Sequence, residues 1–256
     1  MCELFGVSSK YPIKCNEYLR DFFSHSPNHP HGWGLAILDG EDAQIEKEPK
    51  QADKSDYLRE RMTAEISGKT VLAHIRYATI GNVTYNNCHP FTGKDITGRR
   101  WTLIHNGTIF DYPKLHRYLR MQNGETDSER VFLYILDSIN KAVIENNTLD
   151  DESQFNILNE LVTNMAEGNK LNLLFYDGKY TYVHTNQMNT LYMSKNADCI
   201  KFTTNPFNDD EWESVPMNTL LAYKDGKPEF IGMQHKNVYE EKPENTQRLY
   251  QIFSDL

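Results

Sequence analysis

The sequence predicts an α+β fold in which helices and strands form separate layers. Short apolar runs of strand length occur in the N-terminal and C-terminal parts of the chain, and the segment between them has helical periodicity. Regular alternation of strands and helices would instead indicate a doubly wound parallel sheet. With 256 residues and no internal repeat, the chain is expected to form one domain, spanning residues 1–256, that needs no disulfide to stabilise its core.

The N-terminal part contains most of the longer predicted strands. Residues 2–8 and 33–38 are expected strands, and residues 70–76 form a nearly continuous apolar run that is too short for a typical helix. Such a run is typical of a strand buried on both faces. The polar stretch from Ser24 to His31 contains two prolines and three histidines and is expected to be a loop, whereas residues 101–104 form a further strand.

Helical periodicity follows in the middle of the chain. From Ser128 to Val143, apolar residues recur at spacings of three and four, which predicts an amphipathic helix, and residues 157–165 are expected to add a second. The C-terminal part returns to short apolar runs with turn signals such as Asp177-Gly178 between some of them. We expect a meander of strands at residues 171–176, 180–184, 190–193, 200–204, 219–223 and 229–232.

Composition excludes several classes of partner. Lysine and arginine number 27 against 36 aspartate and glutamate, a net charge of -9, and no basic stripe is present, so we expect no nucleic-acid partner. No segment approaches the ~20 apolar residues that span a bilayer, so no membrane partner is expected. The four cysteines, at 2, 15, 88 and 199, form no C-x-x-C pair, which favours reduced thiols and a cytoplasmic location.

The second residue, Cys2, carries the clearest chemical signal. Removal of Met1 would place a thiol and a free α-amine on one residue. An α-amine has a reference pKa of about 7.7 to 8.0, so it can accept a proton at neutral pH and activate its own side chain, as in N-terminal threonine enzymes. The alternative is that Cys2 is a small apolar residue on an N-terminal strand.

Three further motifs allow both a structural and a functional interpretation. Arg76 closes an apolar strand and suits a substrate carboxylate, although locally a strand-end arginine reaching water is the more common arrangement. Asn106-Gly107 is a strong hairpin signal and could also supply the donors of an oxyanion hole. Asp127 precedes a predicted helix, where a helix-start carboxylate is the better-supported local interpretation and an ammonium-binding group is the alternative.

In combination these motifs resemble the class II glutamine amidotransferases, whose glutaminase domain uses an N-terminal cysteine nucleophile. The resemblance covers about the first 130 residues, and the motifs follow the order of the family: Met1 to Val7, His74 to Arg76, Asn87 to Phe91, Trp101 to Gly107 and Gly124 to Glu129. Thr204-Asn205-Pro206 with Trp212 resembles the stand-alone YafJ, EgtC and Dug3-like type. The resemblance implies the four-layer αββα sandwich of N-terminal nucleophile hydrolases, with two mainly antiparallel sheets between helices.

The resemblance also implies a role for each matching residue. Cys2 would be the nucleophile with its freed amine as general base, and Asn106 and Gly107 would form the oxyanion hole. Arg76 would bind the α-carboxylate of glutamine, and Asp127 would bind its α-ammonium group. These roles agree with the chemistry of the residues themselves, since an amino acid is fixed by one cation and one anion.

Two segments differ from the family pattern. Thr79 and the loop from Tyr77 to Cys88 would close over the substrate, but Thr79 is followed here by Ile80-Gly81, where many members have histidine or glycine. Gly34 lies in a segment that varies from the acidic version common in the family. We expect Gly34 to support the nucleophile by close packing.

Six histidines lie in or near these motifs. We expect His74, His89 and His105 to be hydrogen-bonded supports and the loop histidines His25, His29 and His31 to be solvated. Their spacing matches no familiar metal-ligand motif. We therefore expect no metal and no cofactor.

The expected reaction is attack of Cys2 on a γ-glutamyl amide, formation of a thioester and hydrolysis. Residues 2–130 contain the catalytic motifs, and only strands and a polar tail are expected from 171 to 256, which is too short for an ammonia-consuming synthase domain. The protein is thus expected to be a hydrolase of glutamine or of a γ-glutamyl small molecule. The alternatives are a glutaminase subunit that serves a separate synthase chain and a non-catalytic γ-glutamyl sensor or regulatory subunit.

Overall fold

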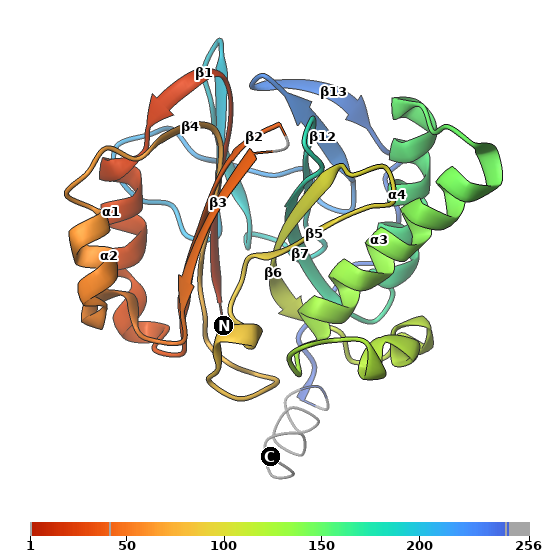
Figure 1. Cartoon of the computed structure of the whole chain (residues 1–256), viewed down its shortest axis with the longest axis horizontal. Coiled ribbons are helices and arrows are strands. Elements are labelled where there is room, and N and C mark those ends of the chain that lie inside the picture. The colour runs from red at the N-terminus through yellow and green to blue at the C-terminus, as the bar shows by residue number, and fades with distance from the viewer. Residues whose placement is uncertain (1, 41, 244, 246–256) are drawn as a thin grey trace.

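A sandwich of four layers forms the protein (Figure 1), as shown by a computed structural model that describes residues 2–40, 42–243 and 245. Two antiparallel sheets pack face to face in the centre. Helices α1 (Asn16–Ser24) and α2 (Asp56–Arg61) cover one sheet, and α3 (Asp127–Asn146) and α4 (Asp151–Met165) cover the other. The expected α+β class and αββα layering are confirmed.

The first sheet, called sheet A here, is organised around the N-terminal strand β1 (Glu3–Lys14). The described residues give it seven strands in the order β11-β9-β10-β1-β4-β2-β3. Phe5 pairs with Thr203 of β10 on one side and with Ala73 of β4 on the other. The remaining strands of sheet A are β2 (Trp33–Asp39), β3 (Asp42–Glu48), β4 (Ser67–Ile75), β9 (Tyr192–Lys195), β10 (Cys199–Thr203) and β11 (Glu213–Ser214).

The second sheet, called sheet B here, has six strands in the described part of the chain, in the order β13-β12-β8-β7-β6-β5. They are β5 (Phe91–Lys94), β6 (Arg100–Thr108), β7 (Lys170–Tyr176), β8 (Thr181–His184), β12 (Leu221–Lys224) and β13 (Lys227–Ile231). The expected meander is therefore wrong, because β9 and β10 leave sheet B and pair within sheet A. The polar tail expected from residue 234 onward lies partly outside the described residues.

The two predicted helices are present and longer than expected. The predicted helix at 128–143 is α3, and that at 157–165 is the C-terminal part of α4. Short 3₁₀ turns η1 (Ser26–Asn28), η2 (Ala52–Lys54), η3 (Tyr85–Asn87) and η4 (Pro113–Arg120) connect the main elements. Of the helices in the described part, none is long and apolar enough to cross a membrane.

Alternation along β1 fixes which side chains face each layer. Phe5 and Val7 belong to the apolar cluster under α1 and α2, whereas Leu4 belongs to the cluster between the two sheets. Side chains two residues apart on a strand share a face. Cys2 therefore continues the inner face of sheet A, at the end of the sandwich where β1 begins.

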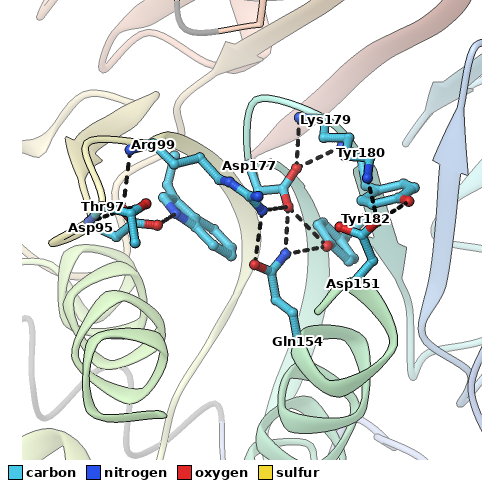
Figure 2. A network of polar contacts seen from close by, with 10 residues as sticks. Asp95, Thr97, Arg99, Asp151, Gln154, Asp177, Lys179, Tyr180 and Tyr182 are labelled. Atoms are coloured by element: carbon cyan, nitrogen blue, oxygen red, sulfur yellow. Dashed lines mark hydrogen bonds and ion pairs between the residues drawn. The ribbon is translucent and has the colours of Figure 1, made fainter. Parts of the chain in front are cut away.

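A buried carboxylate holds the β7–β8 hairpin against α4 (Figure 2). Asp177 is fully buried and accepts hydrogen bonds from the backbone N–H of Tyr180 at 2.6 Å, the side-chain amide of Gln154 at 2.6 Å and the hydroxyl of Tyr182 at 3.1 Å. Arg99 pairs with the same carboxylate at 3.3 Å. Burial of an unpaired charge is costly, and these partners offset that cost for Asp177. The same bonds hold the hairpin in place.

Candidate active site

Cys2 is held beside the end of β4. Its side chain is half-buried, the backbone N–H of Tyr77 lies 3.3 Å from the Cys2 sulfur, and the thiol donates to the Tyr77 carbonyl at 3.4 Å. Burial raises the pKa of the Cys2 thiol, while the Tyr77 backbone and the Arg76 guanidinium act to lower this pKa. The net rise keeps the resting side chain a neutral thiol, so a base is needed to activate it.

Arg76 does not reach out to water. Its side chain is buried at 3% exposure, and the guanidinium donates to the backbone carbonyls of Ile80 at 2.9 Å, Gly81 at 3.0 Å and Asn82 at 2.9 Å. The interpretation of Arg76 as a solvated strand-end arginine is thus wrong. Three of the five guanidinium donors hold the loop after β4, which leaves two donors for a further acceptor.

Asn106 and Gly107 lie within β6 and do not form a turn. Asn106 pairs with Asn172 of β7, so the hairpin interpretation of this dipeptide is wrong. The Asn106 side chain is 2% exposed, and its amide makes no hydrogen bond to any described residue. A Cβ atom at Gly107 would overlap the carbonyl oxygen of Lys170, so glycine permits the close approach of β6 to β7 here.

Asp127 is the first residue of α3, as the helix-start interpretation predicts. Thr126 is the N-cap, with its hydroxyl accepting from the Glu129 N–H at 3.2 Å. The Asp127 carboxylate is buried and accepts from the Ile109 N–H at 2.8 Å. This bond joins the end of β6 to the start of α3, so the carboxylate lies close to the Asn106-Gly107 segment.

The three motif histidines, His74, His89 and His105, are buried near one another, and His105 also contacts the start of α3. His105 Nδ1 lies 2.9 Å from the Ser128 hydroxyl, and His74 donates from Nε2 to the His105 carbonyl at 3.3 Å. The rings of His74 and His89 are 4.0 Å apart. Burial lowers the pKa of each of these imidazoles, so all three are neutral at pH 7.

His89 is not the hydrogen-bonded support that we expected. Neither of its ring nitrogens has a partner among the described residues, although both are buried. Its backbone carbonyl instead lies against Gly34, where a Cβ atom would overlap it. Gly34 pairs with His74 on β4, and His74 pairs with Leu4 on β1. The close packing at Gly34 is therefore connected to the strand that follows Cys2 only through β4.

Of the three loop histidines, His29 is buried and so is not solvated as expected, whereas His25 and His31 are partly exposed. His25 Nδ1 lies 2.8 Å from the Glu3 carboxylate, and His29 Nε2 lies 3.6 Å from its other oxygen. The His31 ring accepts from the Ala78 N–H at 2.9 Å. Within the described ranges, no group of three or more His, Cys, Asp or Glu residues is arranged to hold a metal ion.

Glu125 was missed by the sequence analysis as a residue of the site. It accepts from the Asn82 N–H at 2.8 Å and from the Asn87 amide at 3.0 Å, and these bonds lower the pKa of its carboxyl group. The loop that Arg76 holds is thus fastened from its other side by Glu125. Thr79 lies in this loop, partly exposed, with no hydrogen bond from its side chain to the described part of the chain.

The structure therefore brings together one end of β1, the loop after β4, the end of β6 and the start of α3. A model of the class II glutamine amidotransferases matches residues 1–198, and the chain belongs to this family. Members of the family hydrolyse or transfer the amide of glutamine, and the expectation of an enzyme of this class is confirmed.

Individual relatives agree with this assignment. YafJ of Escherichia coli is 30% identical over 191 residues, which cover 73% of this chain and 74% of YafJ. An uncharacterized protein of Methanocaldococcus jannaschii is 28% identical over 254 residues, covering 89% of this chain and 70% of that protein. The DUG3 protein of Saccharomyces cerevisiae is 25% identical over 207 residues, covering 60% of this chain and 57% of its own length.

Solved structures share the fold. A predicted glutamine amidotransferase from Pseudomonas aeruginosa has a TM-score of 0.61 at 22% identity, covering 89% of this chain and 99% of that chain. Glutamine phosphoribosylpyrophosphate amidotransferase from B. subtilis has a TM-score of 0.66 at 17% identity, covering 93% of this chain and 50% of that chain. At these identities the likeness concerns the fold alone.

Proposed function

We propose that this protein hydrolyses the γ-amide bond of glutamine or of a γ-glutamyl compound through a thioester on Cys2. The observation that carries the proposal is the position of the Cys2 thiol beside the Arg76-Tyr77 backbone. The Asn106 amide, which makes no hydrogen bond to a described residue, lies at the same end of the sandwich. The buried Asp127 carboxylate supplies the anion that an amino-acid substrate requires. We further propose that residues 1–256 act as one catalytic domain.

The nucleophile would be activated by its own amine. Met1 lies outside the described residues, and its removal would leave the amine on Cys2. Because burial raises the pKa of the Cys2 thiol, the free amine must take the thiol proton as the sulfur attacks. The N–H of Tyr77, 3.3 Å from the sulfur, then stabilises the developing thiolate.

The reaction would proceed in two balanced steps. The Cys2 sulfur bonds to the γ-carbonyl carbon, and the Asn106 amide and the Gly107 N–H stabilise the resulting oxyanion. The C–N bond then breaks, the leaving amine takes a proton from the N-terminal ammonium, and a γ-glutamyl thioester remains. Water attacks the thioester, which releases glutamate and restores the thiol.

Substrate binding would use the two buried charges. The two remaining Arg76 donors would bind the α-carboxylate, while the other three keep the loop after β4 in place. Asp127 would bind the α-ammonium group, and Thr79 would contact the substrate from the loop. A glutaminase subunit serving a separate synthase chain is the competing proposal, and stoichiometric co-purification of such a chain would favour it.

Turnover of glutamine by the Met1-processed protein tests the proposal. Cys2→Ala should abolish glutamate release, because in the proposed reaction the thioester forms on the Cys2 sulfur. Cys199→Ala is the matched control, since Cys199 is also a buried free thiol but lies on β10 and takes no part in the proposed reaction. Glutamate release by Cys2→Ala at the wild-type rate would overturn the proposal.

A further inference from the structure

Two peptide units connect Cys2 to His31, a residue that the proposed reaction does not use. In the unit between Arg76 and Tyr77, the carbonyl accepts from the His31 backbone N–H at 3.1 Å, and the N–H donates to the Cys2 sulfur at 3.3 Å. In the unit between Tyr77 and Ala78, the carbonyl accepts from the Cys2 thiol at 3.4 Å, and the N–H donates to His31 Nδ1 at 2.9 Å. Each unit thus binds Cys2 at one end and His31 at the other.

Planarity makes the two ends of each peptide unit move together. Both units are trans, so the carbonyl and the N–H of each point in opposite directions. A rotation that breaks the bond to His31 therefore also turns the group that faces Cys2. The rings of His31 and Tyr77, with centroids 5.2 Å apart, add a further contact. The orientation of both groups around the Cys2 thiol thus depends on His31.

The contact with Ala78 determines which nitrogen of the His31 ring is protonated. A backbone N–H can only donate, so Nδ1 of His31 must accept, and the one proton of the neutral imidazole lies on Nε2. Burial and the Arg76 guanidinium lower the pKa of His31 from its usual 6.5, so the ring is neutral at pH 7. A proton added to Nδ1 in acid would place two N–H groups against each other and break the bond to Ala78.

The charges around His31 favour the neutral ring. Arg76 is positive, so it opposes protonation of His31. Burial raises the pKa of both nearby thiols, to about 11 for Cys88, so they add no negative charge at pH 7. The titratable groups on the surrounding segments, besides Arg76, are the Cys2 thiol, the Tyr77 phenol, the Cys88 thiol beside Gly32 and the pair of His29 with Glu3. The bond to Ala78 is therefore present at neutral pH and is lost as the pH falls through the lowered pKa of His31.

We propose that His31 is a positioning residue for the proposed reaction: its neutral ring holds the two peptide units so that the Tyr77 N–H points at the Cys2 sulfur. The inference rests on the proposed function. His31 acts through the backbone and needs no contact with the substrate. When the bond to Ala78 is lost, the Tyr77 N–H no longer stabilises the thiolate that attacks the γ-carbonyl carbon. Acid should therefore inactivate the enzyme at His31 in addition to protonating the N-terminal amine.

Substitutions of His31 separate its acceptor from its charge. The side-chain oxygen of asparagine can take the place of Nδ1 and accept from Ala78, but an amide does not titrate. Leucine has no acceptor. We expect His31→Leu to lower kcat for glutamine about 10- to 100-fold, as for a misplaced reacting group, whereas His31→Asn should retain most of the wild-type kcat at pH 8.

The dependence of kcat/KM on pH tests the inference, because it reports groups of the free enzyme. As the pH falls, the N-terminal amine, with a reference pKa of about 7.7 to 8.0, is protonated first, and log kcat/KM should fall by about one per pH unit. Below about pH 6.5, the reference pKa of histidine, the slope should steepen toward about two in the wild type and stay near one in His31→Asn. The profile is restricted to pH values from which kcat recovers fully at pH 8, so unfolding does not contribute.

His116→Asn is the matched control. His116 is exposed on η4 and takes part in none of the contacts described above, so this variant should keep the wild-type profile. A wild-type slope that stays near one, a slope near two retained in His31→Asn, or a wild-type kcat in His31→Leu would overturn the inference while leaving the proposed function intact. Failure of the wild type to turn over glutamine at any pH would instead reject the proposed function.

Nitrogen NMR of the imidazole gives a readout that is independent of turnover. In protein labelled at histidine, the His31 signal is assigned by its loss in His31→Asn. At pH 8 we expect an unprotonated Nδ1 and a protonated Nε2, as the contact with Ala78 requires. A proton on Nδ1 at this pH would overturn the inference, whatever the kinetics.

Discussion

At the scale of single residues, the surroundings of Cys2 determine the pKa of its thiol. Exclusion of water from the thiol raises its pKa, while the Tyr77 N–H and the Arg76 cation favour the thiolate. In the proposed reaction, the same burial would strengthen the dipoles that act on the substrate carbonyl, because charges interact more strongly away from water. In the mechanism that we propose, this resting thiol becomes reactive only when its own amine is free.

The amide of Asn106 is the side-chain donor that we propose for the oxyanion. Asn106→Ala should lower kcat for glutamine about 100- to 1000-fold with little change in KM, because the donor acts mainly in the transition state. Steady-state kinetics measure this effect. Asn172→Ala is the control, since Asn172 lies opposite Asn106 but binds Thr185 and Thr190 instead. An unchanged kcat in Asn106→Ala would remove Asn106 from the mechanism.

Buried histidines make the stability of the fold depend on pH. Burial lowers the pKa of His184 from 6.5 to about 3, so the unfolded chain binds its proton first as the pH falls. The stabilisation is complete above pH 6.5 and decreases toward pH 3, with a loss of about 2 kcal/mol at pH 5. His184→Gln should lose less unfolding free energy between pH 7 and pH 5 than the wild type in urea titrations. An identical loss in both proteins would contradict this origin.

At the scale of elements, the start of α3 links helix stability to the site. Thr126 caps the helix, Asp127 binds the end of β6 through Ile109, and Ser128 contacts His105. Three consecutive residues therefore join a helix end to two groups of the candidate active site. The helix end itself was predictable from the capping pattern of Thr126 and Glu129, whereas the contact with Ile109 depends on tertiary packing.

Loss of the α3 cap should affect both stability and activity. Thr126→Ala is expected to cost about 1 kcal/mol of unfolding free energy and also to lower kcat/KM, because Asp127 moves with the helix end. Asp150→Ala is the matched control: Asp150 caps α4 by accepting from the Ser153 N–H at 2.7 Å, far from the site. It should cost a similar free energy at unchanged kcat/KM. If Thr126→Ala left kcat/KM unchanged, as we expect for Asp150→Ala, the start of α3 would not position Asp127.

Elements were predictable where a local pattern identified them. The apolar periodicity of α3 and the apolar runs of β2, β4 and β7 were sufficient to predict these four elements. The short helices α1 and α2 and the strands β3 and β5 were missed, because each is brief and gains most of its stability from packing. The Asn106-Gly107 turn was wrong for a related reason: pairing of Asn106 with Asn172 and of Gly107 with Leu171 of β7 keeps this dipeptide extended.

At the scale of the whole molecule, the two sheets draw their strands from both ends of the chain. The pairing of β10 with β1 could not be predicted from spacing, since it joins segments far apart in the sequence. The same long-range arrangement buries the ring nitrogens of His89, which have no hydrogen-bond partner among the described residues. Residue type and order therefore indicated the residues of the candidate site, whereas the contacts of these residues depend on how the sheets pack.

The central claim is that Cys2, with its amine exposed, reacts at a pocket for the γ-glutamyl group. Intact mass and peptide mapping after incubation with a diazoketone analogue of glutamine test this claim directly. The account predicts loss of Met1 and a single adduct on Cys2, with no adduct in Cys2→Ala or in the presence of excess glutamine. Complete removal of Met1 with no adduct on Cys2, in a protein that still binds glutamine, would contradict it.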